Sequence, residues 1–306
     1  MTEPRKAFCQ RKSRVAASYL VSYKVYVDSL PTLQDNLAQL TTLLQRRRVL
    51  VLSGAGISTE SGIPDYRGPE SSKKPRNPMR YQQFVGSDAA RQRYWARSFR
   101  GWQRVAEARP NLGHNALAQL EKERGFTGLI TQNVDGLHQA AGSRNVLELH
   151  GSLAAVRCLT CRAASSRRKL QARMHVANPA LQIKTSELAP DGDADISEEA
   201  IRHFNVPACE RCGGVLKPDV VFFGENVPKE RVTHAWRMLE QAEVLLVVGS
   251  SLTVFSGYRF VARAAKEGKP VVIINAGPTR GDKDACLCVD AKLGEVLPSL
   301  VAELCA

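Results

Sequence analysis

The sequence predicts an α/β fold, a Rossmann-like, doubly wound parallel sheet with a smaller module inserted into it. Short, almost entirely apolar segments alternate with amphipathic segments, which is typical of parallel strands that helices cover on both faces. Between residues 152 and 217 this alternation stops and polar residues dominate. Two Cys-x-x-Cys pairs lie inside that interval. We therefore expect the residues on either side of the interval to build the sheet.

The spacing of apolar residues predicts each element in turn. Leucines recur at helical spacing from Leu33 to Leu44, and Gly125 and Gly268 stand where a helix would end. Helices are expected at 33–47, 88–107, 114–124, 229–241 and 256–267. Strands are expected at 49–52, 129–131, 146–149, 220–223, 244–248 and 271–274. The segment 54–80 is rich in Gly, Pro and Ser and is expected to be loop-like.

The chain is basic, with 43 Lys and Arg against 30 Asp and Glu and a net charge of +13. The excess is uneven, since residues 73–109 hold ten basic residues and two acidic ones. Residues 157–173 hold six basic and no acidic ones, whereas 187–199 hold six acidic and no basic ones. Such runs are either solvated surface or attract an anion, which would be a cofactor phosphate, an acidic substrate or nucleic acid. No apolar run reaches the roughly 18 residues of a membrane span, so no membrane association is expected.

The N-terminal segment 1–30 is expected to be a flexible basic arm. It carries six basic and two acidic residues and lacks the apolar core of a secretory signal. A mitochondrial transit peptide is one interpretation of a segment that contains serine and is poor in acids. A disordered arm or a misassigned start codon explains it equally well.

The cysteines at positions 158, 161, 209 and 212 form two Cys-x-x-Cys pairs. Four thiolates in this arrangement are the ligand set of a tetrahedral zinc site, so Cys158, Cys161, Cys209 and Cys212 are the predicted metal ligands. The 47 residues between the pairs exceed the usual spacing, which indicates a long insertion within the module. A closed site with four cysteines leaves no position for substrate, so the zinc is expected to be structural. The other four cysteines are scattered and do not suggest a disulfide framework.

A glycine-rich segment, Gly54-Ala55-Gly56-Ile57-Ser58, directly follows a predicted strand. Glycines at such a place let backbone N–H groups approach a pyrophosphate closely. The match to a dinucleotide fingerprint is imperfect, because Thr59 stands where a third glycine is usual. Taken alone, the motif is better explained by a structural turn. The next segment places Asp65, Tyr66 and Arg67 on a loop beside it.

Small and hydrogen-bonding residues also follow the other predicted strands. They are Gln132-Asn133-Val134-Asp135, His150-Gly151, Gly249-Ser250-Ser251 and Asn275. Ligands of open α/β sheets bind at the carboxyl ends of the strands, so these residues indicate one dinucleotide. For each segment alone, an ordinary strand-to-helix turn is the alternative. A histidine in this setting suits general-base chemistry near neutral pH, whereas a lone histidine is more often a hydrogen-bonded core residue.

Taken together, these segments resemble the sirtuins, a family of NAD-dependent protein deacylases. The matching segments, which stand in the family's order, are 54–58, 62–67, 131–135, 150–151, the four cysteines, 216–225, 249–252 and Asn275. The resemblance covers about residues 33–303. Three features resemble the class II branch, which includes bacterial enzymes and a mitochondrial lipoamidase-type sirtuin. They are Tyr94-Trp95-Ala96-Arg97, the long insertion between the cysteine pairs and the segment 189–193.

The resemblance implies a sirtuin catalytic domain over 31–306, with the nucleotide-binding fold in 31–151 and 218–306 and the zinc module in 152–217. It implies NAD and Zn²⁺ as cofactors and acylated-lysine proteins as substrates. The acyl group would pass from lysine to ADP-ribose with release of nicotinamide. His150 would act as the general base on a ribose hydroxyl, and Asn133 and Asp135 would complete the catalytic set.

The resemblance also assigns binding residues. NAD contacts are expected at Gly54, Ala55, Gly56, Ser58, Ile63, Asp65, Tyr66, Arg67, Gln132, Asn133, Val134, Asp135, Gly249, Ser250, Ser251, Asn275, Ala276, Gly277 and, through its backbone against adenine, Leu293. Substrate contacts are expected at Tyr94, Arg97, Val221, Phe223, Gly224, Glu225 and Val254. The substrate peptide would pair with the chain at 223–225 and 253–255 like an added strand. Tyr94 and Arg97 share a helix face and would clamp an acidic acyl group, unless Arg97 is an ordinary surface residue.

Three alternatives stay open from the sequence. The same NAD site would serve a protein ADP-ribosyltransferase or a lipoamidase-type deacylase. A zinc-module nucleic-acid binder would use the basic runs but leaves His150 and the Gly54 segment unexplained, so no specific nucleic acid is expected. A monomer in the cytoplasm is expected, with the mitochondrial matrix as the alternative location.

Overall fold

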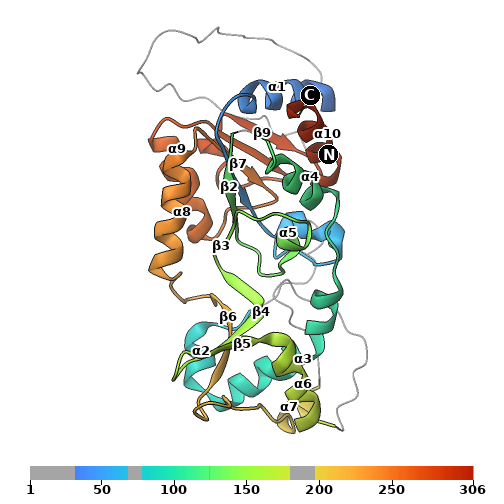
Figure 1. Ribbon diagram of the computed structural model, residues 1–306, viewed down its shortest axis with the longest axis vertical. Helices are drawn as coiled ribbons and strands as arrows, with labels where there is room; N and C mark the ends of the chain where they lie inside the picture. The colour runs from blue at the N-terminus through green and yellow to red at the C-terminus, as the bar shows by residue number, and fades with distance from the viewer. Residues whose placement is uncertain (1–31, 68–77, 124, 180–196, 306) are drawn as a thin grey trace, which may run out of the picture.

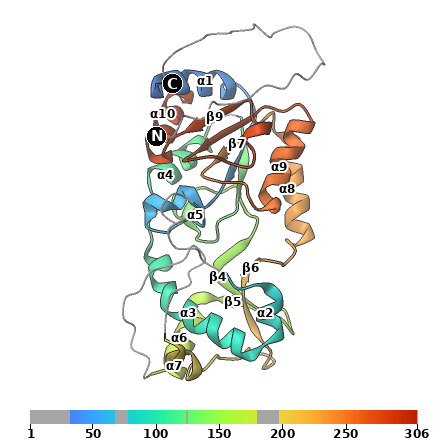
Figure 2. The ribbon, with the colours of Figure 1, turned by 180° about the vertical axis from the view of Figure 1, so that it is seen from behind.

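The computed structural model describes residues 32–67, 78–123, 125–179 and 197–305. Figures 1 and 2 show an elongated molecule with a larger part that holds the parallel sheet and a smaller part below it. The predicted N-terminal arm and the segment 189–193 lie outside the described residues. Within the described ranges, none of the helices is both long enough and apolar enough to cross a membrane.

Six parallel strands form the main sheet, in the order β3-β2-β1-β7-β8-β9. Their bounds are β1 Val49–Ser53, β2 Phe126–Thr131, β3 Val146–Glu148, β7 Val244–Val248, β8 Val271–Asn275 and β9 Leu287–Asp290. The chain runs outward from β1 to β3 in one direction and then from β7 to β9 in the other. The strand order therefore reverses between β1 and β7, and a crevice opens at the carboxyl ends of strands at such a point.

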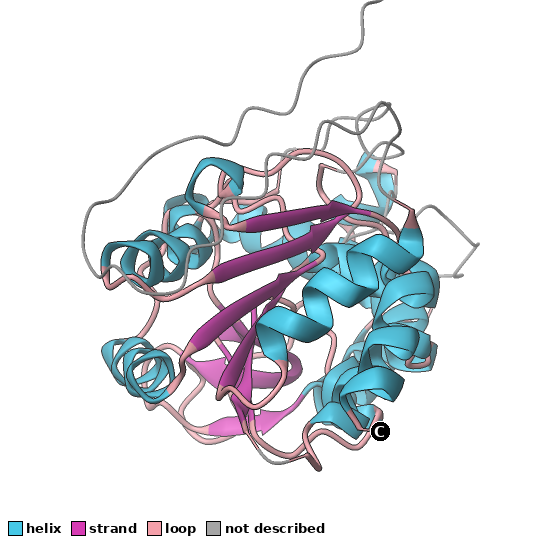
Figure 3. Ribbon diagram, turned by 90° about the horizontal axis from the view of Figure 1, so that it is seen from above, coloured by secondary structure: helices cyan, strands magenta, loops and turns pink. Residues whose placement is uncertain are grey.

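Helices cover both faces of this sheet, as Figure 3 shows. On one face lie α1 (Leu33–Leu44), α4 (Leu112–Leu120) and α10 (Leu293–Leu304). On the other face lie α8 (Lys229–Gln241) and α9 (Phe255–Lys266). Alternate residues of each strand enter the two cores: Val51 packs with the first group and Leu52 with the second. This arrangement confirms the predicted fold class.

The smaller part contains a three-stranded antiparallel sheet in the order β5-β4-β6. Its strands are β4 Gly151–Cys158, β5 Ala164–Ser166 and β6 Leu216–Val220. Its helices are α2 Tyr81–Gly86, α3 Asp88–Glu107, α6 Arg167–Ala177 and α7 Glu198–Arg202. Trp95 and Phe99 of α3 share one buried cluster with Val156 and Leu170. The segment 81–107, which the sequence-based boundary assigns to the nucleotide-binding fold, therefore packs with the inserted module.

The 3-10 turn η1 (Ala55–Ser61) and the helix α5 (Leu137–Ala140) follow β1 and β2, and the 3-10 turn η3 (Asp282–Asp284) precedes β9. The prediction of a loop over 54–80 misses the turn η1. The predicted strand 220–223 is also wrong, because the strand ends at Val220 and belongs to the antiparallel sheet. Val221, Phe222 and Phe223 line a pocket instead. In the sequence, apolar residues that line a pocket look the same as apolar residues that are buried in a sheet.

Candidate active site

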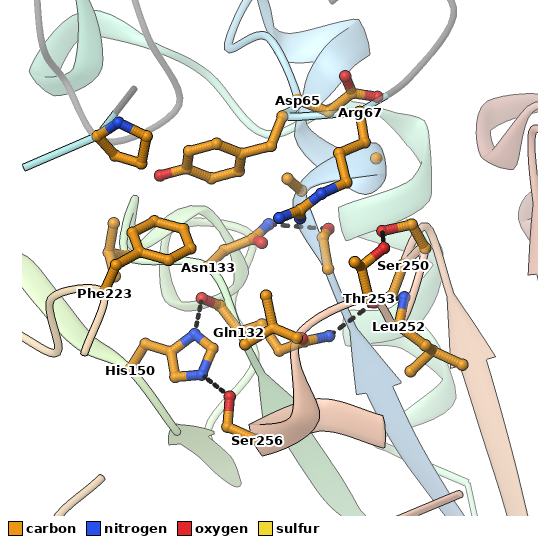
Figure 4. Close-up of a pocket in the computed structure, with 18 of the residues that line it drawn as sticks. Asp65, Arg67, Gln132, Asn133, His150, Phe223, Ser250, Leu252, Thr253 and Ser256 are labelled. Atoms are coloured by element: carbon orange, nitrogen blue, oxygen red, sulfur yellow. Dashed lines mark hydrogen bonds between the residues drawn. The ribbon is translucent and has the colours of Figure 1, made fainter. Parts of the chain in front are cut away.

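A cavity of about 610 Å³ lies at the carboxyl edge of the sheet, next to the smaller part. Figure 4 shows its polar wall, with His150 and Gln132 facing the loop that carries Asp65 and Arg67. Every residue predicted to contact NAD, except Leu293, is among the described residues that line it. Leu293 begins α10 and is buried. The convergence of segments far apart in sequence is the arrangement expected at a reversal of strand order.

Gly54 and Gly56 bring the end of β1 against the end of β7. A Cβ atom on Gly54 would lie 2.8 Å from the carbonyl oxygen of Gly249, and one on Gly56 would lie 2.9 Å from it. The Gly56 N–H donates to the Gly249 carbonyl at 2.8 Å, and the Gly54 N–H donates to the Val248 carbonyl at 3.1 Å. In this structure the two N–H groups are therefore used within the sheet edge rather than being free for a phosphate. The glycines serve the close approach of two strand ends.

Ser58 joins the turn η1 to the loop after β2. Its hydroxyl donates to Asp135 Oδ2 at 2.7 Å and accepts from Asn133 Nδ2 at 3.0 Å. The other Asp135 oxygen accepts from the Leu137 N–H at 2.9 Å. Burial raises the pKa of Asp135, and these hydrogen bonds oppose that shift. Asn133 and Asp135 are thus held in fixed positions before any ligand binds.

His150 has a hydrogen bond at each ring nitrogen, as Figure 4 shows. Nδ1 lies 3.0 Å from the carbonyl oxygen of Gln132, and Nε2 lies 2.8 Å from Ser256 Oγ. A carbonyl oxygen only accepts, so in the neutral ring Nδ1 carries the hydrogen and Nε2 carries the lone pair. Burial lowers the pKa of His150 to about 4, and the charges of Arg259 and Arg231 act in the same direction. At neutral pH the imidazole is therefore uncharged and able to accept a proton at Nε2.

Ser256 is a site residue that the sequence analysis does not identify. It lines the cavity and contacts His150, but it stands inside an ordinary helical pattern with no motif around it. Its only sequence signal is its position directly after the segment 253–255, which is expected to meet the substrate. Met79, Phe222, Leu252 and Pro278 also line the cavity and were not identified.

The loop that follows β6 forms the opposite wall and is tightly held. The buried Lys217 ammonium lies 2.9 Å from Glu225 Oε2, which also accepts from the Phe222 N–H at 2.9 Å. The Phe223 carbonyl accepts from the Tyr81 N–H at 2.9 Å, and the Gly224 carbonyl accepts from the Gln82 side chain at 3.1 Å. These hydrogen bonds hold the wall at Phe223 and Gly224 against α2.

Tyr94 and Arg97 have different surroundings in spite of their shared helix. Tyr94 is buried, packs edge-on against Phe84 and Phe222, and lines the cavity. Arg97 is half-buried and does not belong to the described residues that line it. The structure therefore brings only the first member of the proposed acidic-acyl clamp to the cavity.

The four predicted metal ligands converge at one end of the antiparallel sheet. Their sulfur atoms all lie within 4.8 Å of one another, with 3.6 Å between Cys158 and Cys212 and 3.8 Å between Cys161 and Cys209. Four sulfurs at about 2.3 Å from a tetrahedral zinc would be separated by about 3.8 Å, so the set fits the ion. The Cys161 N–H points at the Cys158 sulfur and lowers the pKa of that thiol to about 6.

Comparison with known proteins shows which family the chain belongs to. A family model described as Sir2 family matches residues 54–256, which include the cysteine pairs and all of the cavity loops except 275–278. The chain belongs to the Sir2 family. A Sir2 relative from Streptomyces coelicolor, named NAD-dependent protein deacetylase 1, is 53% identical over 275 residues, which cover 90% of this chain and 92% of the relative.

Two further Sir2 proteins broaden the comparison. The human mitochondrial protein named NAD-dependent protein lipoamidase sirtuin-4 is 49% identical over 82% of this chain and 81% of its own length. A solved Sir2 structure with a p53 peptide and NAD⁺ has a TM-score of 0.70 and 30% identity, and the match covers 87% of this chain and 98% of that chain. The sequence-based resemblance to sirtuins is thereby confirmed.

Two buried histidines lie close to the carboxyl end of β1. His138 Nε2 lies 2.8 Å from the hydroxyl of Ser53, which donates to Thr131 at 2.9 Å. The His114 ring lies 4.9 Å from the His138 ring, and its Nδ1 lies 3.0 Å from Asn111 Oδ1. Burial lowers the pKa of His114 to about 4 and that of His138 to about 3. Both rings are therefore neutral in the folded protein.

These histidines predict loss of stability in mild acid. An unfolded histidine has a pKa of about 6.5, so between that value and the folded pKa the unfolded chain binds more protons and stability rises with pH. The stability that comes from burying the neutral rings is complete above about pH 6.5 and is lost as the pH falls toward 4. For His114 this loss amounts to about 3 kcal/mol. Urea unfolding at several pH values should show this slope. The dependence of stability on pH should become shallower in His114→Gln. The control His234→Gln changes an exposed residue of α8 and should keep the wild-type slope. An equal slope in His114→Gln and the wild type would contradict the prediction.

Proposed function

We propose that this chain is an NAD-dependent protein lysine deacylase that transfers the acyl group from lysine to ADP-ribose and releases nicotinamide. The observation that carries the proposal is the neutral His150, which lines the cavity at the reversal of strand order and whose Nε2 accepts a hydrogen bond from Ser256 there. The Sir2 relatives named deacetylases, about half identical over most of the chain, support the same reaction class.

The residues that would hold NAD come from four strand ends. Ser250 and the turn at Asn275 would hold the phosphate and adenosine side, and Asn133 and Asp135 the ribose and nicotinamide side. Asp65, Tyr66 and Arg67 would close over the cofactor. When bound, NAD supplies the ribose carbon that takes up the acyl oxygen and the nicotinamide that leaves. The chain's part is to fix these groups, to exclude water and to take a proton at His150 Nε2.

The acyl group is expected to be neutral. Near Tyr94 the wall is apolar, with Phe222 and Val220 among its residues, and Arg97 is not part of the described lining. Acetyl is the first candidate. A lipoyl group is the second, because the human relative at 49% identity is named a lipoamidase.

A mass-spectrometric assay with one lysine peptide carrying acetyl, succinyl, glutaryl, lipoyl or myristoyl tests this proposal. Turnover of a neutral acyl group with O-acyl-ADP-ribose as product is expected. Arg97→Met should leave the ratio of acetyl to succinyl turnover within about twofold, because the side chain lies outside the described lining. A preference for an acidic acyl group that Arg97→Met removes would establish the clamp instead. Label from NAD that stays on protein would favour the ADP-ribosyltransferase.

The proposed partners are proteins with acylated lysines, the proposed oligomeric state is a monomer, and the proposed location is the cytoplasm. The bacterial relatives support that location. The human mitochondrial relative keeps the mitochondrial matrix as the alternative.

A further inference from the structure

The proton acceptor of His150 is already in contact with a hydroxyl group of the chain. Nδ1 is bound to the Gln132 carbonyl, so Nε2 is the nitrogen that can accept a proton. The Ser256 hydroxyl lies 2.8 Å from this nitrogen and must donate to it. Both side chains line the cavity, and Figure 4 shows Ser256 on the ring edge opposite the Gln132 carbonyl. A substrate hydroxyl therefore reaches His150 either through Ser256 or by displacing it.

The start of α9 holds Ser256 firmly in this place. The Arg259 Nε donates to the Ser256 carbonyl at 3.1 Å. Gly257 packs so closely on Gln132 that a Cβ atom there would lie 2.4 Å from Gln132 Oε1. Gln132 in turn donates to Ser250 Oγ at 2.8 Å. One residue, Gln132, thus fixes both the imidazole and the helix that carries the serine, and moving the Ser256 backbone away from His150 would require this packing to change.

We propose that Ser256 relays the proton from a substrate hydroxyl to His150, a proposal that rests on the proposed deacylase function. In this step Ser256 Oγ accepts the proton of the substrate hydroxyl while its own proton moves to His150 Nε2. The O–H bond of the substrate breaks and a new O–H bond forms on the serine. The serine ends neutral, the imidazole becomes an imidazolium ion, and the electron pair stays on the substrate oxygen, which becomes the nucleophile.

The hydrogen bond itself is tested without NAD. In protein labelled with ¹⁵N-histidine, the wild-type spectrum should show His150 with a protonated Nδ1 and an unprotonated Nε2 that accepts a hydrogen bond. Ser256→Ala should shift the Nε2 resonance, and Ser256→Thr should restore it, while the signal of His234 stays unchanged. An identical His150 signal in wild type and Ser256→Ala would overturn the proposal.

The relay is tested by separating two kinetic steps. Exchange of labelled nicotinamide into NAD, in the presence of acyl peptide, precedes the action of the base and should stay within about twofold in Ser256→Ala. Deacylation kcat should fall at least tenfold, on the order expected for a lost proton-transfer group, with KM within about twofold. Ser256→Thr should recover most of the rate, and Thr42→Ala on the exposed face of α1 is the matched hydroxyl deletion.

Two outcomes would refute the relay specifically. Deacylation by Ser256→Ala at the wild-type rate or faster would mean that the substrate hydroxyl displaces the serine. Equal loss of exchange and deacylation would mean that Ser256 only shapes the cavity. Failure of the proposed function would look different, because the wild-type protein itself would then turn over none of the acyl peptides.

Discussion

His150→Ala is expected to lower the deacylation kcat by a factor between about 10² and 10⁴, the usual contribution of a general base. The imidazole is neutral at physiological pH because burial lowers its pKa to about 4. The neutral ring can therefore accept a proton at Nε2, where it meets Ser256. Binding of NAD should persist, since the Ser58, Asn133 and Asp135 network forms without the ring. Peptide turnover by mass spectrometry and NAD binding by calorimetry would measure the two effects.

The matched control is His234→Ala, which removes an exposed imidazole from α8 and should leave kcat unchanged. Thermal unfolding of both variants shows whether the fold is retained. If His150→Ala binds NAD and still turns over peptide at the wild-type rate, the general-base assignment is wrong. If it loses NAD binding as well, His150 contributes to the cofactor site rather than to proton transfer alone.

Cys158→Ala is expected to release zinc and to unfold the smaller part of the molecule. The Cys158 side chain is fully buried at the end of β4 and belongs to the cluster that joins α3, α6 and the antiparallel sheet. Structural zinc contributes roughly 10–16 kcal/mol of apparent binding free energy in zinc-finger peptides, and that binding energy is folding energy. Metal content by mass spectrometry and far-UV circular dichroism would detect the change.

Cys288→Ala is the control, because Cys288 is an exposed residue of β9 outside the cysteine cluster. It should keep one zinc per chain and full activity. A chelator should reproduce the Cys158→Ala effect in the wild-type protein, and added Zn²⁺ should reverse it. An active, correctly folded Cys158→Ala protein without zinc would contradict the structural role of the metal.

Local pattern and structure agree most closely where one physical cause dominates. The helix at 229–241 is found with the predicted bounds because its apolar stripe faces a single core. The strand at 244–248 is likewise found as predicted, since both of its faces are buried. The run at 220–223 misleads because apolar residues that line a cavity resemble those of a buried strand. Helix α3 is found where the sequence predicts a helix. The cluster of the smaller part that it packs into is not predictable in this way, because amphipathicity does not specify which core a helix joins.

The sequence by itself determined the α/β class, the four metal ligands and the strand-end residues of the cavity. These properties depend on residue type and spacing within short segments, where the chain geometry is known in advance. Only the tertiary structure decided that Ser256 meets His150 Nε2, that Arg97 stays outside the described cavity lining and that Gly54 and Gly56 close the sheet edge. Each of these depends on contacts between segments far apart in the chain, which strand order and helix packing bring together and no local pattern encodes.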